Sequence, residues 1–201
     1  MFLSKILITG ASCRNPYEIH RALWKLFPED AEASRDFLFR VEHSDVNQAE
    51  ILMQSIREPA FAYEEARVIA SKEYPLSVST GHRLRFKLVA NPVKTINDEK
   101  GRKNIRGGIK KCRIPLIREE DQRAWIERKC LAAATLDSLS IDPMFPLRFK
   151  RNKEDHAGKI QPIAFLGILK IKDADAFVGL VKKGIGPAKA FGCGLLSLAR
   201  T

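Results

Sequence analysis

The sequence predicts an α+β fold in two tandem domains, residues 1–80 and 81–201. Strand-like stretches alternate with amphipathic helices, and the same order of elements occurs twice along the chain. With 201 residues, of which 45% are hydrophobic, the chain is long enough to form two cores. Thr80 and Gly81 separate the two series of elements. The order βαββαβ is typical of the ferredoxin-like, or RRM-like, unit, so we expect two such units in tandem.

The first half is predicted to contain one clear helix among several strands. Residues 2–9 are strand-like, residues 16–27 are helical, the segments FLFRVEHS (37–44) and AEILMQSI (49–56) alternate as strands, and a further β-rich stretch continues to about residue 79. The segment RDFLFRVE has Asp36 and Leu38 where an RRM aromatic strand needs small residues. Phe37 and Phe39 are therefore interpreted as core residues rather than as a platform for stacking RNA bases.

The second half is predicted to repeat this order. In sequence order we expect a strand from residue 82, a basic loop, a strand around CRIPLI (112–117), a helix over 119–136, strands around 145–150 and 159–171, a helix over 173–183, and a last strand after a glycine-rich loop. The helix over 173–183 has the strongest pattern, since Ala174, Phe177, Val178 and Val181 recur at helical spacing. Asp173 before it and Gly184 after it are typical of a helix start and end.

The chain carries a strong excess of positive charge. It has 35 Lys and Arg residues against 24 Asp and Glu, a formal net charge of +11 and a pI of about 9.7. This balance favours a polyanionic partner, either nucleic acid or an anionic membrane surface. A membrane is the weaker alternative, because no apolar run approaches the roughly 18 to 20 residues of a membrane span. The first residues also lack the pattern of a signal peptide.

The cysteines give no sign of a metal site or of cross-links. Cys13, Cys112, Cys130 and Cys193 are scattered along the chain without a C-x-x-C pair. This pattern indicates neither a zinc site nor a disulfide framework. We therefore expect reduced thiols, a cytoplasmic location, and no metal or small-molecule cofactor.

Two basic segments are candidates for nucleic-acid contact. In HRLRFKLVA, the apolar Leu84, Phe86 and Leu88 alternate with Arg83, Arg85 and Lys87, which places three cations on one face of a strand. In KGRKNIRGGIKKCR, residues 100–113, seven of fourteen residues are Lys or Arg, none is acidic, and Gly107-Gly108 predicts a hairpin tip. We call residues 100–113 the basic ribbon. A solvated loop is the usual interpretation of a charge run, but like charges this close repel unless a polyanion neutralises them, which favours nucleic acid.

The segment GIGPAKAFGCGLLSL, residues 184–198, combines four glycines with Lys189. Its spacing fits neither the P-loop nor the dinucleotide fingerprint, and it runs from a helix into a strand, the reverse of both. A mononucleotide site is therefore disfavoured. Two interpretations remain, a helix end with a tight connection to the last strand, or a cradle of backbone N–H groups for an anion.

His20 lies in the predicted helix NPYEIHRALWKLFPED. On a helical projection it belongs to one broad apolar arc, which comprises Tyr17, Ile19, His20, Leu23, Trp24, Leu26 and Phe27. Such a histidine is either a structural residue bonded to a carbonyl or a group that moves protons near neutral pH. RNA offers a reaction that suits the second role, because the 2′-OH is an internal nucleophile and no metal is obligatory. The sequence shows no local cluster of Asp, Glu and His that would suggest a metal nuclease.

Seven segments together resemble the CasE-type endoribonuclease subunit of the CRISPR Cascade complex. These are LSKILI, YEIHRALWKLFP, RDFLFRVE, ANPVKTI, KKCRIPLI, GKIQPIAFLG and KKGIGPAKAFGCGLLSLA, which span nearly the whole chain in the family's order. The resemblance implies tandem ferredoxin-like domains and metal-independent cleavage of precursor CRISPR RNA at the 3′ base of each repeat hairpin. It further implies a 5′-hydroxyl and a 2′,3′-cyclic phosphate, or its opened form, as products. Retention of the mature guide RNA and assembly with other Cascade subunits are also implied.

The same resemblance implies the residues of the site. The family's catalytic histidine falls on His20, and some relatives carry a tyrosine one turn later, where this sequence has Leu23. Tyr17 is the substitute candidate for orienting the site, and Lys159 is the candidate for neutralising the phosphorane. The expected RNA-binding residues are Arg83, Arg85 and Lys87 of the strand, Lys103, Arg106, Lys110, Lys111 and Arg113 of the basic ribbon, and Gly186, Lys189, Gly192 and Gly194 of the glycine-rich segment. The alternative is a non-catalytic subunit that binds RNA hairpins, with a structural His20.

Overall fold

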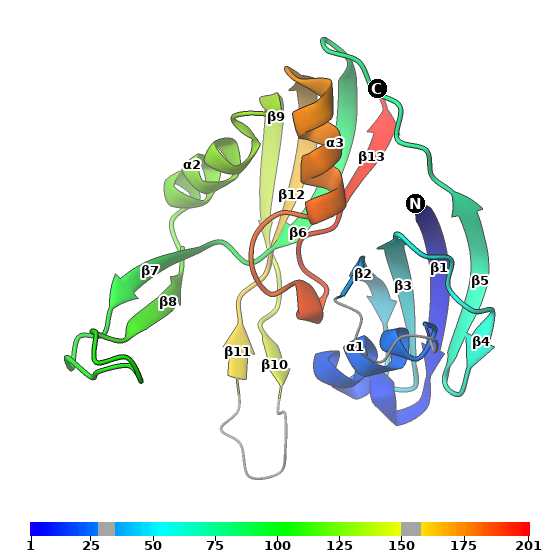
Figure 1. The fold of residues 1–201 in the computed structure, drawn as a ribbon, viewed down its shortest axis with the longest axis horizontal. Helices are drawn as coiled ribbons and strands as arrows, with labels where there is room; N and C mark the ends of the chain where they lie inside the picture. The colour runs from blue at the N-terminus through cyan, green and yellow to red at the C-terminus, as the bar shows by residue number, and fades with distance from the viewer. Residues whose placement is uncertain (28–34, 150–157) are drawn as a thin grey trace.

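The structure is a computed structural model in which residues 1–27, 35–149 and 158–201 are described. Its strands form two main antiparallel sheets, one from each half of the chain, with two hairpins beside the second sheet (Figure 1). All strands of the first sheet precede residue 80, and all strands of the second sheet follow it. The domain boundary at 80/81 itself stays a prediction.

The first sheet has the strand order of a ferredoxin-like unit. Its strands are β1 (Phe2–Thr9), β2 (Phe37–Ser44), β3 (Gln48–Ser55), β4 (Ala62–Tyr63) and β5 (Ala66–Glu73), in the order β2-β3-β1-β5-β4. A short 3₁₀ helix, η1 (Gly10–Arg14), and α1 (Pro16–Trp24) connect β1 to β2. Leu23 of α1 packs with Ile6, Phe39 and Met53 of the sheet in one buried core. Phe37 and Phe39 are 2% and 1% exposed, which confirms their prediction as core residues.

Only one crossover helix forms in the described part of this half. The second helix expected of a βαββαβ unit is replaced by residues 56–65, which form a loop and the short strand β4. Pro59 lies in the middle of this segment, and proline both lacks an N–H donor and disfavours helical backbone at the residue before it. The predicted helix over 16–27 also ends earlier, at Trp24, and continues as a turn.

The second half forms a complete βαββαβ unit. Its elements are β6 (Arg83–Ala90), α2 (Glu119–Cys130), β9 (Ala134–Pro143), β12 (Ile163–Ile171), α3 (Ala174–Lys183) and β13 (Leu196–Arg200), with strand order β13-β6-β12-β9. Two hairpins are inserted, β7 (Val93–Asn97) with β8 (Lys111–Pro115) and β10 (Leu147–Phe149) with β11 (Gly158–Ile160), and a 3₁₀ helix, η2 (Lys189–Phe191), precedes β13. Both helices lie on the same side of this sheet as its buried core (Figure 1).

Two predicted elements of this half differ from the structure. The helix predicted over 119–136 ends at Cys130, and β9 begins at Ala134. The pairing of β9 with β12 shifts register between Ile168 and Leu169, so β9 has one extra residue there. Leu136 and Leu139 are therefore three residues apart, and the sequence of β9 does not show the alternation with a period of two that predicts a strand. The strand predicted over 159–171 forms as two strands, β11 and β12. The strand predicted around 145–150 forms as β10 (Leu147–Phe149), and residue 150 lies outside the described residues.

Buried polar bonds join the two halves. Arg40 of β2 is 3% exposed, and its Nη1 donates to the carbonyl oxygens of Lys87 (3.1 Å) and Leu195 (3.4 Å) in the second half. Glu42 accepts from both Arg40 and the Lys87 ammonium, the latter at 2.7 Å. Gln54 of β3 adds a buried bond to the carbonyl of Val181 (3.1 Å). Since buried donors need partners, these bonds fix how the first sheet meets the second.

The glycine-rich segment packs against this junction. Gly184 ends α3 with a φ of 72°, as the sequence predicted for a helix end, and Gly194 donates to the carbonyl of Val89 (2.7 Å). A Cβ atom added to Gly184 would lie 2.7 Å from Leu38 Cδ1 of β2 and 2.9 Å from the carbonyl oxygen of Gly194. The segment therefore needs glycine where it approaches the first sheet.

We predict that Gly184→Ala lowers the free energy of unfolding by about 2 kcal/mol, because alanine adds both left-handed strain and overlap with Leu38. The matched control is Gly179→Ala in the same helix, where nothing lies within 4 Å of the added Cβ. This control should raise stability by about 0.5 to 1 kcal/mol. Urea unfolding measures both. A Gly184→Ala protein as stable as the parent would show that close approach does not require glycine here.

Candidate active site and RNA interface

His20 lies on α1 above the aromatic residues of β2. Asn15 caps the helix by accepting from the backbone N–H of Tyr17 (3.1 Å), and Pro16 occupies the first helical position. The imidazole centroid is 6.3 Å from that of Trp24, 5.7 Å from Phe37 and 6.2 Å from Phe39. Its Nε2 atom is buried and has no hydrogen-bond partner among the described residues. For this nitrogen, the carbonyl partner expected of a structural histidine is therefore not seen.

The surroundings of His20 keep its imidazole uncharged at neutral pH. Burial, and to a lesser extent charge repulsion from the guanidinium of Arg35, lower the pKa of His20 to about 4. An uncharged imidazole can accept a proton, whereas donating one requires the charged form. In the free protein the electrostatics therefore fit a proton acceptor better than a proton donor.

Arg35 is a site residue that the sequence analysis missed. It lies two residues before the start of β2, and its Nε atom is buried with no hydrogen-bond partner in the described part of the chain. Burial also lowers the pKa of the Arg35 guanidinium. The only sequence signal was a cation just before an apolar strand, which is common at protein surfaces and does not indicate a site.

Lys189 lies on η2, which contacts α1. Its Nζ donates to the carbonyl oxygen of Lys183 at 2.6 Å. Burial lowers the pKa of Lys189, and the nearby charges of Arg35, Lys183 and Lys129 lower it further. The structure thus brings the predicted Lys189 to the helix of His20 and surrounds it with other cations.

The two auxiliary catalytic candidates lie on different elements. Tyr17 is half-buried one turn before His20 on α1. Lys159 is exposed on β11, directly opposite Arg148 of β10, so both side chains point to the same face of this hairpin. Strand β10 contacts α1, and the ring of Phe149 lies 4.2 Å from that of Phe191 in η2. These contacts hold the hairpin near the helix of His20, and the roles of Tyr17 and Lys159 stay predictions.

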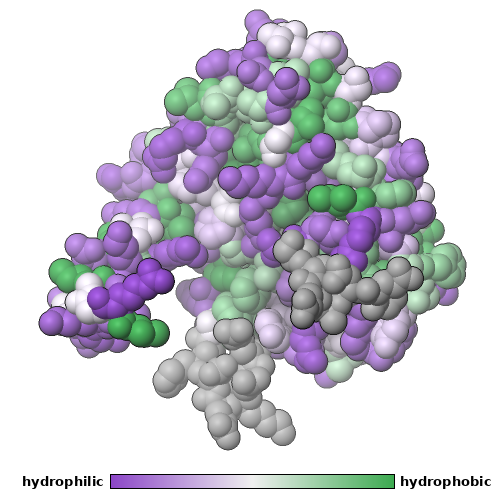
Figure 2. All heavy atoms as spheres, in the orientation of Figure 1, coloured by the Kyte–Doolittle hydropathy of each residue, from purple (hydrophilic) through white to green (hydrophobic). Residues whose placement is uncertain are grey.

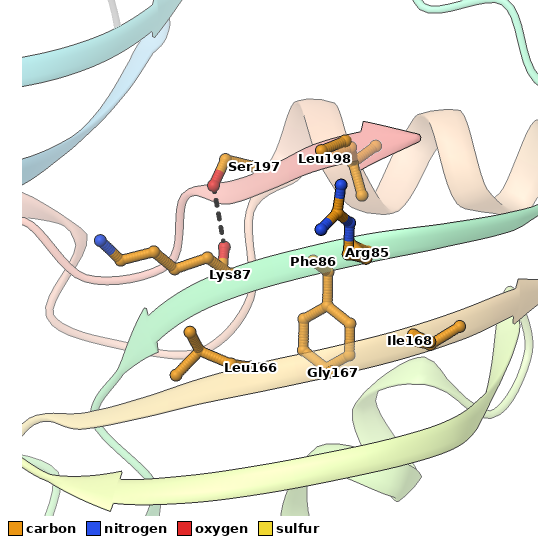
Figure 3. A pocket seen from close by; sticks show the side chains of 9 residues that line it. Arg85, Phe86, Lys87, Leu166, Gly167, Ile168, Ser197 and Leu198 are labelled. Carbon is orange, nitrogen blue, oxygen red and sulfur yellow. Dashed lines mark hydrogen bonds between the residues drawn. The ribbon is translucent and has the colours of Figure 1, made fainter. Parts of the chain in front are cut away.

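The predicted cationic face of β6 forms, but its charges are engaged within the protein. Arg83 pairs with Asp137 (2.8 Å), Lys87 pairs with Glu42 (2.7 Å), and Arg85 donates to the carbonyl oxygen of Arg200 (3.0 Å). Figure 3 shows Arg85 and Phe86 on opposite sides of β6, as the alternation predicted. An open hollow of about 550 Å³, lined mainly by apolar atoms, lies along this face. RNA contact at these three cations stays a prediction. Because each has a partner within the protein, this face offers less unpaired positive charge than the sequence suggested.

The basic ribbon is an arm that projects from the second sheet. Strands β7 and β8 pair, Lys103 bridges to Ile109, and Gly107 with a φ of 79° forms part of the tip, which confirms the predicted hairpin. Arg102 pairs with Asp98 (2.7 Å) and holds the pKa of that carboxyl well below its usual range. The remaining predicted cations of the arm, Lys103, Arg106, Lys110, Lys111 and Arg113, are exposed and form no ion pair with described residues. Figure 2 shows this arm as mainly hydrophilic.

Two glycines of the 184–198 segment are used for packing within the protein. Gly192 and Gly194 are buried, a Cβ on Gly192 would lie 3.4 Å from the ring of Phe39, and the N–H of Gly194 is already bonded to Val89. For Gly192 and Gly194, the geometry therefore supports a tight connection to the last strand rather than a cradle for an anion. Gly186 and Lys189, which are half-buried, remain the candidates of this segment for RNA contact.

The described residues give no sign of a metal site or of a membrane-spanning helix. Across residues 1–27, 35–149 and 158–201, no group of His, Cys, Asp and Glu is arranged to hold a metal ion. All four cysteines are free thiols. None of the described helices combines the length and apolar character needed to cross a membrane.

Comparison with known proteins identifies the family. The family model for CRISPR associated protein matches residues 1–200. The chain belongs to this CRISPR-associated family. It is 44% identical over 200 residues to the CRISPR system Cascade subunit CasE of Escherichia coli K12, covering 99% of both proteins. It is also 30% identical over 222 residues to the CRISPR-associated endoribonuclease Cse3 of Thermus thermophilus, covering 99% of this chain and 100% of the relative.

Solved structures of family members agree with the fold. The CRISPR-associated protein Cas6e from Escherichia coli K-12 superposes with a TM-score of 0.85 at 42% identity over the full length of both chains. CRISPR endoribonuclease Cse3 bound to 19-nucleotide RNA superposes with a TM-score of 0.79 at 28% identity, covering 99% of this chain and 100% of that one. The predicted family resemblance and the tandem ferredoxin-like fold are thereby confirmed.

The pKa of His20 has a consequence for stability that depends on pH. With a folded pKa of about 4 and an unfolded pKa near 6.5, the unfolded chain binds more protons between these values. Stability therefore falls as the pH falls from about 6.5 to 4, with a slope of at most about 1.4 kcal/mol per pH unit from this group. We predict that His20→Gln removes that part of the slope, whereas the exposed His43→Gln leaves it in place. Urea unfolding at pH 7, 6, 5 and 4.5 compares the slopes, and equal slopes would refute a depressed pKa.

Proposed function

We propose that this protein is an endoribonuclease that cleaves precursor CRISPR RNA at the 3′ base of the repeat hairpin and keeps the mature guide RNA as a Cascade subunit. The observation that carries the proposal is the full-length similarity to the Cascade subunit CasE and to the endoribonuclease Cse3. Cse3 has also been solved with an RNA that represents a pre-cleavage complex. The charge of Arg35 near His20 and the exposed basic arm of the second half support the same function.

The chemistry we propose is an internal transfer without a metal. The 2′-OH attacks the adjacent phosphorus, so that the O2′–P bond forms while the P–O5′ bond breaks. One product ends in a 2′,3′-cyclic phosphate and the other begins with a 5′-hydroxyl. The uncharged His20 is suited to accept the 2′-OH proton and to pass it to the leaving 5′-oxygen, which gives the 5′-hydroxyl. Tyr17 is the candidate for orienting the site and Lys159 is the candidate for neutralising the phosphorane.

The basic ribbon is proposed to hold the stem of the repeat hairpin. Five of its exposed cations, Lys103, Arg106, Lys110, Lys111 and Arg113, are arranged along a narrow two-stranded arm. Contacts to phosphates dominate the affinity of such surfaces. An A-form stem presents its phosphates on a regular helical track, so an arm of this kind recognises shape more than base sequence. Positioning by these contacts would then align the 2′-OH with the leaving oxygen near His20.

The first test of the proposal is His20→Ala with a labelled repeat hairpin in EDTA. We expect the single-turnover cleavage rate to fall by about 10² to 10⁴-fold because proton transfer is lost, whereas the Kd of the hairpin changes little. His43→Ala, an exposed histidine at the end of β2, is the control and should cleave normally. A 2′-deoxy nucleotide 5′ of the cut should abolish cleavage by the parent protein without loss of binding.

The other outcomes of this experiment are equally informative. If parent and His20→Ala cleave at the same rate, His20 is structural and the active site lies elsewhere. If both bind the hairpin and neither cleaves it, the protein is the non-catalytic hairpin-binding subunit. Cleavage that EDTA abolishes would refute the metal-independent mechanism.

The second test addresses the basic ribbon. Neutralising Arg106, Lys110 and Lys111 with glutamine should weaken hairpin binding and reduce the slope of log K against log salt by about one per lost phosphate contact. The control is Arg67→Gln with Lys72→Gln, exposed cations on β5. Filter binding between about 50 and 200 mM salt measures the slopes. An unchanged slope would return the ribbon to the interpretation as a solvated loop.

A further inference from the structure

A second cavity lies beside His20, at the junction of the two halves. It encloses about 270 Å³, and its lining includes four cations from three parts of the chain: Arg35 before β2, Lys182 and Lys183 at the end of α3, and Lys189 on η2. Asp36 also lines it, but its carboxylate is paired with Arg57 at 2.7 Å. Among the described residues of the lining, no other carboxylate balances the four cations, and the cavity is therefore suited to an anion.

The charged forms of two of these cations, Arg35 and Lys189, are destabilised in the free protein. Arg35 has a buried Nε with no hydrogen-bond partner among the described residues, although a guanidinium carries five donors in one plane. Lys189 is crowded by Arg35 and Lys183, whose charges, together with burial, lower its pKa. A buried cation without a counter-charge is unfavourable, and an anion in the cavity would relieve both residues.

The cavity adjoins the candidate catalytic histidine. Phe37 lines it, and the same ring lies 5.7 Å from the imidazole of His20. The charge of Arg35 acts on His20 directly, since it lowers the pKa of that imidazole. Other titratable groups on the elements around His20 include Tyr17, Glu18 and Arg21 of α1, Arg14 of η1, Arg40, Glu42 and His43 of β2, Lys189 of η2 and Arg148 of β10. Glu18 is paired with Arg21 (3.2 Å), and Glu42 is paired with Arg40.

We propose that this cavity binds a phosphodiester group of the RNA substrate and that Arg35 is the positioning residue that couples its occupancy to the charge of His20. The proposal rests on the proposed function only in the identity of the anion as RNA. With the cavity empty, Arg35 repels a proton from His20. With a phosphate against Arg35 and Lys189, that repulsion is offset and His20 takes up a proton more readily. The phosphate thereby makes the imidazole a stronger base for the 2′-OH proton, and it stabilises the charged form until that proton passes to the leaving 5′-oxygen.

The test follows the His20 imidazole by NMR in the full chain across pH 3.5 to 8. Free protein, protein with inorganic phosphate and protein with a 2′-deoxy-blocked repeat hairpin are compared. We expect the blocked hairpin to raise the pKa of His20 by about one unit, because offsetting one nearby charge typically shifts a pKa by one to three. Inorganic phosphate at millimolar concentration should raise it less. No rise with either anion would overturn the proposal.

Variants separate the coupling from a structural effect. In Arg35→Gln the pKa of His20 should start higher in the free protein, and the rise on RNA binding should shrink by at least half. Arg35→Lys should restore most of the rise, and Arg21→Gln, which removes an exposed cation from α1 itself, should behave like the parent. Equal rises in parent and Arg35→Gln would overturn the coupling. If Arg35→Gln does not fold, Lys183→Gln on the opposite wall must reduce the rise instead.

The blocked hairpin keeps this test independent of cleavage. A rise in the pKa of His20 that depends on Arg35, seen in a protein that does not cut its hairpin, would support the phosphate site while refuting the nuclease function. In a protein that cuts, the pH profile of the single-turnover rate adds a kinetic measurement. There the acidic limb, along which the rate falls as His20 becomes protonated, should move for Arg35→Gln by the same amount as the pKa of His20 in the RNA complex, and an unmoved limb would count against the coupling.

Discussion

The buried guanidinium of Arg40 is the constraint on which the rest of this structure depends. Its donors reach the carbonyl oxygens of Lys87 and Leu195 in the second half, and Glu42 balances its charge. Such a buried cation stabilises little by itself, but displacing its partners would leave a charge unsolvated. Strand β2 is therefore fixed against β6 and the chain before β13. Strand β2 also provides the rings of Phe37 and Phe39 beneath His20. The bonds of Arg40 therefore fix the position of α1 relative to the glycine-rich segment.

The glycine-rich segment is a tightly packed connection between α3 and β13. A phosphate-binding loop presents free N–H groups before a helix, whereas here the N–H of Gly194 is bonded to Val89 and Gly192 is buried against Phe39. Left-handed backbone at Gly184 and Gly194 lets the chain turn tightly enough for η2 to reach α1. Packing alone therefore places η2, which carries Lys189, against the helix of His20. Any contact of Lys189 with RNA would use a geometry that already exists without RNA.

The sequence was sufficient for features that depend on local pattern. The alternation in HRLRFKLVA placed Arg83, Arg85 and Lys87 on one face, and the capping residues placed α3 within one residue of its observed start. It could not reveal that Glu42 and Asp137 neutralise two of those cations, because both carboxylates arrive from other strands. Arg35 and Arg40 were missed for the same reason. Their importance comes from burial against the other half of the chain, and no periodicity within a segment records that.

The low pKa of His20 is unfavourable for a proton donor, yet it follows from the charge distribution that makes the protein suited to RNA. Every cation placed to attract phosphate near α1 also repels a proton from the imidazole, as Arg35 does. A histidine in such a site stays uncharged until an anion offsets those cations. In the proposed function RNA supplies that anion, and among the described residues the buried Nε2 atom has no hydrogen-bond partner. The positive surface and the uncharged histidine then form one electrostatic arrangement, in which the phosphate of the substrate makes the proposed catalytic imidazole a stronger base.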